Sequence, residues 1–205
     1  MVKIKKEKST EDKILAAAKK IFLKKGMAGA RMQDIADEAG INKAMLHYYF
    51  RNKDKLFEVI FLDAAEKFFP KVNYIFEAEM PLFEKIEYFC DEYISILVEN
   101  PYLPVFVLNE INRDLEGFLT NIWKKDRLPQ PQKFLEQIER EIKRGTIKRI
   151  SPVQLIMNLI SMTIFPFVGR AMFQYNMNID DMQFRMIMEQ RKKEIPKFII
   201  DSIKK

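Results

Sequence analysis

The stretch NKAMLHYYF, residues 42–50, concentrates hydrogen-bonding side chains around two apolar ones. Leu46 and Phe50 lie four positions apart, so a helix over this stretch would turn both toward the protein interior. The opposite side of that helix would be polar or small, as it must be to enter the major groove of DNA and reach base edges. The outward residues would be Asn42, Lys43, Ala44, His47 and Tyr48.

Individual side chains in this region suit the reading of bases. Lys43 can reach guanine or a phosphate, and Gln33 can pair with adenine. Ala44 or Met45 can pack on the methyl group of thymine. His47 is the one histidine of the chain, so no second imidazole is present to build a metal site or a catalytic pair. We expect a DNA contact here, with no enzyme activity, no metal and no cofactor.

Two short helices must hold this polar face. The pattern predicts a helix over 32–39 that ends at Gly40, the residue best able to adopt the left-handed conformation after a helix. Asn42 then caps a second helix over 43–49. Because the turn between them is so short, the second helix must cross the first, which predicts a helix-turn-helix.

The remaining chain also reads as helical, which predicts an all-α fold. Apolar residues recur at helical spacing, and proline and glycine supply the breaks. The first helix should run over 10–25, with Thr10 as its cap and Gly26 as its stop, and Pro70 should kink the fourth helix or end it early. The later helices are predicted over 53–78, 82–99, 102–110, 112–125, 131–144, 152–174 and 180–203.

The basic charge is confined to one end of the chain. Residues 1–55 hold 14 Lys and Arg against 7 Asp and Glu, whereas residues 56–205 hold 21 against 22. Local positive charge beside a neutral remainder is typical of a phosphate-binding head, although a solvated lysine surface gives the same count. Residues 1–9 form a basic tail within this head.

Cysteine usage and hydropathy indicate a cytoplasmic protein. Cys90 is the single cysteine and cannot form an internal disulfide, and residues 1–13 lack the apolar core of a secretory signal. The run over 151–173 approaches membrane-spanning length but contains Gln154 and Arg170, so we expect a buried helix and no membrane.

Residues 10–57, TEDKILAAAKKIFLKKGMAGARMQDIADEAGINKAMLHYYFRNKDKLF, resemble the N-terminal DNA-binding domain of TetR-type transcriptional regulators. The resemblance covers nearly a quarter of the chain. It rests on apolar pairs between 14 and 22, Gly26, DIA at 34–36, AG at 39–40, and L-x-x-Y-F at 46–50 followed by Lys53 and Leu56.

This resemblance implies which residues contact DNA. Arg31 would replace a phosphate contact, because Ala30 stands where the family commonly has Thr. His47 stands where the family favours Tyr; a neutral imidazole can donate one hydrogen bond, and its protonation would make DNA affinity mildly pH-dependent. Lys53 would grip phosphate at the start of the fourth helix. The implied set is Arg31, Gln33, Asn42, Lys43, Ala44, Met45, His47, Tyr48, Tyr49 and Lys53.

The resemblance also implies a helix-turn-helix domain over 1–52 and a helical effector-binding and dimerisation domain over 53–205. The chain would be a homodimeric repressor, paired through about 152–203 and released from double-stranded operator DNA by a small apolar or amphipathic effector. A ligand-independent regulator or activator, and a helical enzyme with a nucleic-acid docking head, are the alternatives. Aromatic and sulfur residues that could line the effector pocket, or fill the core instead, are Phe61, Phe68, Cys90, Tyr93, Phe106, Phe118, Trp123, Met162 and Phe165.

Overall fold

Helices account for the regular secondary structure of the described chain. The computed structural model describes residues 9–122 and 131–205, except for the side chains of Phe68, Asn121 and Ile122. No strand occurs within these ranges, where Ile147 and Lys204 form an isolated bridge. The predicted all-α class is therefore confirmed.

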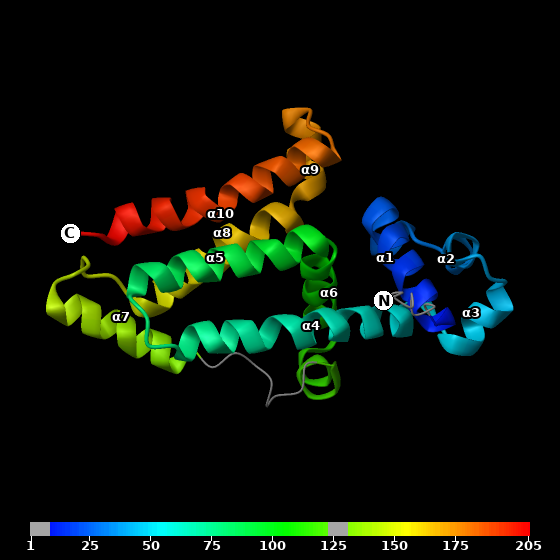
Figure 1. The fold of residues 1–205 in the computed structure, drawn as a ribbon, viewed down its shortest axis with the longest axis horizontal. Coiled ribbons are helices and arrows are strands. Elements are labelled where there is room, and N and C mark those ends of the chain that lie inside the picture. The colour runs from blue at the N-terminus through cyan, green and yellow to red at the C-terminus, as the bar shows by residue number, and fades with distance from the viewer. Residues whose placement is uncertain (1–8, 123–130) are drawn as a thin grey trace, which may run out of the picture. The chain divides into compact units, whose positions relative to one another are not determined.

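The chain divides into two compact units (Figure 1). Unit 1 is Met1–Ala64 and unit 2 is Ala65–Lys205. Helix α4, Lys53–Glu77, begins in unit 1 and ends in unit 2. The expected boundary after residue 52 thus differs from the structural one, because Leu56, Phe57 and Ile60 at the start of α4 are fully buried.

Unit 1 contains three further helices: α1 (Thr10–Gly29), α2 (Met32–Ala39) and α3 (Lys43–Tyr49). Ser9, rather than Thr10, caps α1, because its hydroxyl accepts from the N–H of Asp12 at 3.1 Å. Gly26 breaks the helical geometry with a φ of 68°, although one more turn follows it. The rings of Phe22 and Phe57 pack edge to face with centroids 4.9 Å apart, which joins α1 to α4 in the core of unit 1.

Unit 2 is built around long helices that pack along one another. Helix α10 packs along α5, and α8 contacts both (Figure 1). The buried side chains of these helices, together with those of α7 and the end of α4, form one hydrophobic core. The helices after α4 are α5 (Leu82–Glu99), α6 (Leu103–Gly117), the π-helix η1 (Phe118–Ile122), α7 (Gln132–Arg144), α8 (Pro152–Val168), α9 (Arg170–Met177) and α10 (Asp181–Ile203).

Two predicted helix breaks in unit 2 differ from the structure. Helix α4 does continue past Pro70 to Glu77, close to the predicted end at residue 78, since Val72, Ile75 and Phe76 beyond the proline are buried in the core. Helix α6 runs through the predicted break near residue 111 and loses helical geometry at Asp114 instead. The predicted helix over 152–174 is two helices, α8 and α9, bent by 66° at Gly169.

A proline inside α8 ties that helix to α10. Pro166 has no N–H, so the carbonyl of Met162, four residues earlier, lacks its helical partner. Arg191 on α10 donates from Nη2 to this carbonyl at 2.9 Å. Burial lowers the pKa of Arg191. The guanidinium therefore satisfies a carbonyl that the helix itself cannot, and it fixes α8 against α10.

A buried lysine closes the end of α4. Lys85 is 2% exposed, and its ammonium donates to the carbonyl of Phe76 at 3.1 Å. It also lies 5.5 Å from the centre of the Phe134 ring. Burial lowers the pKa of Lys85. A cation at the last carbonyls of a helix is stabilising, so Lys85 holds this end of α4 within unit 2.

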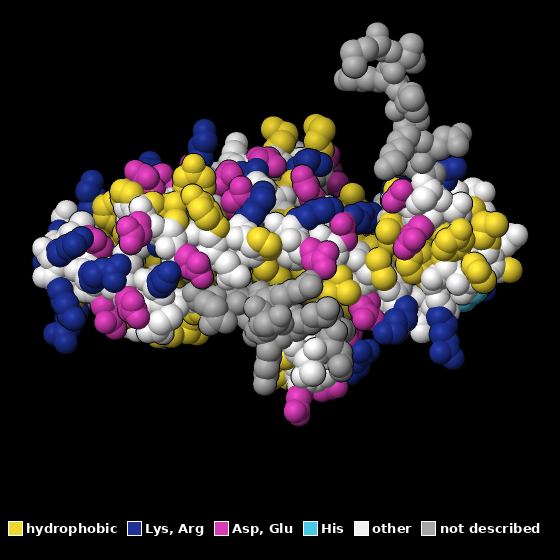
Figure 2. Space-filling view, turned by 60° about the horizontal axis from the view of Figure 1, so that its bottom comes forward, with side chains coloured by type: hydrophobic (Ala, Val, Ile, Leu, Met, Phe, Trp, Pro, Cys, Tyr) yellow, Lys and Arg dark blue, Asp and Glu magenta, His cyan; other side chains and the backbone are white. Residues whose placement is uncertain are grey.

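The surface of unit 2 carries mixed charge. Figure 2 shows Lys and Arg side chains interspersed with Asp and Glu on the visible face. No single described helix is apolar and long enough to cross a membrane, and α8 and α9 pass such a test only as a bent pair.

Candidate nucleic-acid interface

The turn between α2 and α3 has the predicted local chemistry. Gly40 adopts the left-handed conformation with a φ of 69°, and its N–H bonds to the carbonyl of Asp37 at 3.2 Å. The N–H of Ile41 reaches the carbonyl of Ala36 at 3.0 Å. Asn42 then accepts from the N–H of Met45 at 2.7 Å and starts α3. These local bonds set the direction in which α3 leaves the turn.

Helix α3 has one buried side and one exposed side, as its spacing predicts. Leu46 is fully buried and Phe50 is 5% exposed. The outward side chains are in solvent, and Tyr48 extends furthest, with 87% of its surface exposed. The exposed set is Asn42, Lys43, Ala44, Met45, His47, Tyr48 and Tyr49. The structure therefore brings seven of the ten predicted DNA contacts together on one short helix and its cap.

Some basic side chains of unit 1 are paired with carboxylates and others are not. Four lysines pair with carboxylates: Lys19 with Asp63, Lys20 with Glu38, Lys25 with Asp34, and Lys55 with Glu58. Lys43 and Arg51 form no ion pair within the described residues, and they stand at the start of α3 and just beyond its end. Lys13, Lys24 and Arg31 are likewise exposed and form no ion pair in the part of the chain that the structure describes, so Lys43 and Arg51 are the available cations that flank α3. Arg51 is absent from the predicted contacts, although a basic residue just after a recognition helix is a readable signal.

Helix α2 carries two predicted contacts, Arg31 and Gln33. Arg31 precedes the helix and donates its backbone N–H to Asp34 at 3.1 Å, while its side chain is exposed. A hydrogen bond from Lys25 holds the pKa of Asp34 below its ordinary value. Gln33 is exposed and donates to Asp37 one turn along at 2.8 Å. Gln33 must exchange that bond for one to adenine if it is to read a base.

Lys53 has a structural partner that its sequence position does not reveal. Its ammonium donates to the carbonyls of Met27 at 2.8 Å and Ala30 at 3.1 Å. It thereby joins the start of α4 to the end of α1. An ammonium has three N–H donors, so one remains for the predicted phosphate contact, which stays a prediction.

The effector residues predicted from the sequence do not all share one environment. Cys90, Phe106 and Phe118 are buried in unit 2, and burial raises the pKa of the Tyr93 phenol. Met162 lies on α8, where its carbonyl binds Arg191. Phe165 is 54% exposed and packs on Phe173 at the surface. The buried side of α8 consists of Leu155, Leu159, Thr163, Pro166 and Phe167. Phe61 belongs to unit 1, and the Phe68 side chain and Trp123 lie outside the described residues.

We expect Cys90 to be unreactive in the folded protein. Its side chain is fully buried, and burial raises the pKa of its thiol to about 12. Because the thiolate is the reactive form, a disulfide reagent should modify Cys90 only after denaturant is added. The absorbance of the thiolate that the reagent releases measures the extent of modification directly. Stoichiometric modification of the native protein at neutral pH would show that the core around Cys90 opens.

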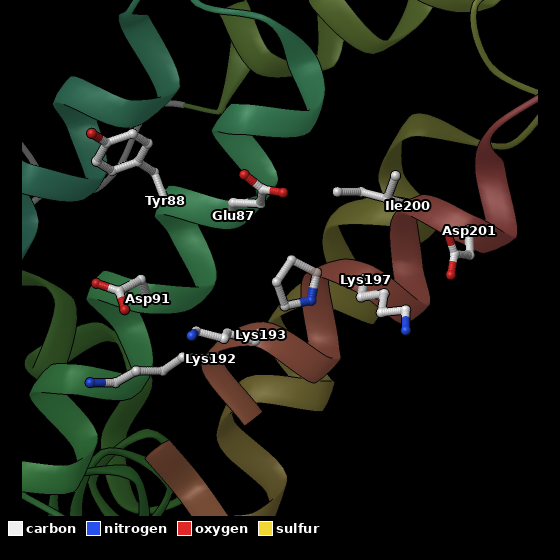
Figure 3. Close-up of a pocket in the computed structure, with 9 residues that line it drawn as sticks. Glu87, Tyr88, Asp91, Lys192, Lys193, Lys197, Ile200 and Asp201 are labelled. Carbon is white, nitrogen blue, oxygen red and sulfur yellow. The ribbon is translucent and has the colours of Figure 1, made fainter. Parts of the chain in front are cut away.

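A groove of about 480 Å³ lies on unit 2 between α5 and α10 (Figure 3). Glu87 and Asp91 line it from α5, and Lys193 and Lys197 line it from α10. No described member of the predicted effector set lines this groove. Its charged walls differ from the apolar surroundings expected for the effector. No group of three or more His, Cys, Asp or Glu side chains in the described ranges could hold a metal ion.

Known proteins share the motif and the fold. Residues 14–60 match the family model described as bacterial regulatory proteins, tetR family. The HTH-type transcriptional repressor NicS of Pseudomonas putida is 48% identical over 48 residues, so the match spans 23% of this chain and 23% of NicS. The uncharacterized HTH-type transcriptional regulator YhgD of Bacillus subtilis is 26% identical over 149 residues, which are 68% of this chain and 72% of YhgD.

A solved structure extends the likeness to both units. The ketosteroid transcriptional regulator KstR2 of Mycobacterium tuberculosis has a TM-score of 0.69 to this chain, covers 96% of each chain and is 15% identical. At this identity the likeness shows the fold alone. The helix-turn-helix segment of unit 1 thus matches the tetR family of bacterial regulatory proteins, and the helical fold of both units is similar to that of a solved transcriptional regulator.

Proposed function

We propose that this chain is a homodimeric repressor. Its two α3 helices would read the half-sites of a pseudo-palindromic operator, and a small apolar or amphipathic effector would release the protein from that operator. The observation that carries the proposal is the exposed side of α3, where hydrogen-bonding side chains stand between Lys43 and Arg51. Such a helix can enter a major groove while the flanking cations bind phosphates. A regulator that binds operator DNA acts where the chromosome is, so we propose that the protein works in the bacterial cytoplasm.

An exposed apolar stripe supports the dimer. Val153, Met157 and Ile160 lie four and three residues apart along α8 and are 56%, 53% and 37% exposed. Phe198 on the neighbouring α10 is 63% exposed. A single exposed apolar side chain is ordinary, but a stripe across two helices is typical of an interface. We propose that α8 and α10 of two copies pack as a four-helix bundle within the predicted region 152–203.

Charging this stripe should produce monomers. We expect Met157→Glu and Ile160→Glu together to halve the molar mass measured by light scattering, because two copies would bury four unpaired carboxylates. Both side chains are exposed, so helicity by circular dichroism should not change. Tyr88→Glu, on an exposed side chain of α5, is the matched control. A charged double variant that keeps the parent's mass would contradict this interface.

The composition of unit 2 and a structural neighbour support an apolar effector. The interior of unit 2 is rich in aromatic rings, including the Phe76, Phe89 and Phe134 group, whose neighbouring centroids lie 5.4–5.9 Å apart. KstR2, which shares the fold, is named as a ketosteroid regulator. Helix α4 continues from unit 1 into unit 2, so this one helix is part of both the proposed DNA-binding unit and the proposed effector-binding unit. An effector that displaces α4 would spoil the spacing of about 34–36 Å that successive grooves require.

Selection of bound fragments from the source genome tests the DNA-binding part of the proposal. The protein should enrich a few fragments that share an inverted repeat, and it should bind them at least about 10³-fold more tightly than unrelated DNA at one fixed salt concentration. Enrichment that follows fragment length alone, with no shared sequence, would contradict operator reading.

A further inference from the structure

The imidazole of His47 is held by a backbone carbonyl. Its Nδ1 lies 3.1 Å from the carbonyl oxygen of Arg51, one helical turn further along the chain. A carbonyl oxygen can only accept a hydrogen bond, so the hydrogen must sit on Nδ1. The other ring nitrogen, Nε2, then carries a lone pair when the ring is neutral. His47 is exposed on the same side of α3 as Lys43, four residues earlier.

This tautomer changes what the side chain can do on DNA. The one N–H of the neutral ring is already used by Arg51, so none remains for a phosphate oxygen. Nε2 can only accept, and it therefore needs a donor. In the major groove the base donors are the amino groups of cytosine, at N4, and adenine, at N6. Guanine presents only acceptors there, and thymine presents an acceptor and a methyl group.

We propose that neutral His47 is a specificity-determining residue that accepts through Nε2 from the amino group of one cytosine or adenine in each half-site. This inference rests on the proposed operator binding by α3, and it adds the chemical class of base that one position must contain. It replaces the expectation that a neutral His47 donates its hydrogen bond to DNA.

Two variants separate the acceptor from the rest of the interface. His47→Asn keeps an amide N–H near the position of Nδ1, so the bond to the Arg51 carbonyl can persist, but it removes the nitrogen at Nε2. Lys197→Ala removes a cation from an exposed position of unit 2 and leaves α3 and the Arg51 carbonyl unchanged, so it is the control. Selection from random duplexes at pH 8 should give the parent and Lys197→Ala the same base preferences. His47→Asn should lose its preference at one position in each half-site, where the parent selects C or A.

A base analogue then identifies the atom. We replace the selected dC by its 2-pyrimidinone analogue, or the selected dA by its purine analogue, which deletes the amino group. One substitution should weaken binding by the parent about 2- to 12-fold per half-site, the range expected for one hydrogen bond. For His47→Asn, the base analogue at the selected position should change DNA affinity no more than the same analogue does at a DNA position that the protein does not contact.

The outcomes distinguish this inference from the proposed function. A parent that selects no sequence overturns both. A parent that selects a clear operator but prefers G or T at the position altered in His47→Asn overturns only the role of Nε2. The same follows if His47→Asn selects the parent's operator unchanged, or if loss of the amino group weakens parent and variant equally.

Discussion

Lys43→Ala and Tyr48→Ala should each weaken operator binding strongly while leaving the fold intact. Both side chains are exposed on α3, and Tyr48 is 87% exposed, so neither supports the core. Loss of a good base contact costs about 1–3 kcal/mol per half-site. A dimer on two half-sites therefore loses about 2–6 kcal/mol, which is a fall in affinity of about 30-fold to 10⁴-fold.

Fluorescence anisotropy on the selected operator measures this loss. Lys197→Ala and Tyr74→Ala are matched controls, because they remove the same residue types from exposed positions in unit 2. Circular dichroism should be the same for all four variants. If Lys43→Ala and Tyr48→Ala bind the operator as tightly as their controls do, α3 is not the recognition helix.

Phe57→Ala should cause a large loss of stability in unit 1. The Phe57 side chain is fully buried, and its ring packs edge to face on Phe22. Truncation of a buried phenylalanine costs about 3–5 kcal/mol, because apolar contacts are lost and a cavity is left. The free energy of unfolding, from denaturant titrations followed by circular dichroism, should fall by that amount.

Val59→Ala is the control for this variant, since Val59 lies on the same helix but is 36% exposed. Its effect should be small, as surface substitutions usually are. Operator binding should fail at a lower temperature in Phe57→Ala than in the control, because α1 and α4 support α3. A loss for Phe57→Ala no greater than that for Val59→Ala would show that this ring pair does not hold unit 1 together.

The recognition elements were predictable because their signals are local. Gly40 ends α2 and Asn42 starts α3 through bonds that span five residues or fewer. The spacing of Leu46 and Phe50 sets which side of α3 faces solvent. The pattern along residues 32–50 contains all of this information, so the bounds of α2 and α3 match the prediction.

Local sequence patterns could not predict the contacts between residues far apart in the chain. Lys53 binds carbonyls 26 and 23 residues away, and nothing near Lys53 in the sequence indicates Met27 or Ala30 as partners. The bond between His47 and the Arg51 carbonyl is local, but helical periodicity does not reveal it, because it depends on the side-chain rotamer and on the backbone just after α3. The Lys53 contacts depend on tertiary placement, which changes the role of a side chain without changing its exposure.

Helix breaks in unit 2 were the other difference. Gly169 sits inside a continuous apolar run, and a single glycine is often tolerated within a helix, so the run over 152–174 reads as one element. Pro70 does not end α4 early, because buried residues on both sides of it hold the helix together, and α4 reaches nearly the predicted end at residue 78. A stripe of aromatic residues in the sequence does not tell which of them face inward. Phe165 was therefore included among the predicted effector residues, although it is exposed in the structure.

Reciprocal titration of effector and operator tests the central claim most directly. Apolar and amphipathic compounds are first screened for those that raise the melting temperature of the protein. The dissociation constant of the best compound is then measured by calorimetry with and without saturating operator duplex. By linkage, operator must weaken effector binding by the same factor by which effector weakens operator binding, typically about 5- to 150-fold.

The account predicts two equal factors within this range, and an unrelated duplex at the same concentration should leave effector affinity unchanged. Equal effector affinity with and without operator, for every compound that stabilises the protein, would contradict effector-controlled repression and favour a ligand-independent regulator.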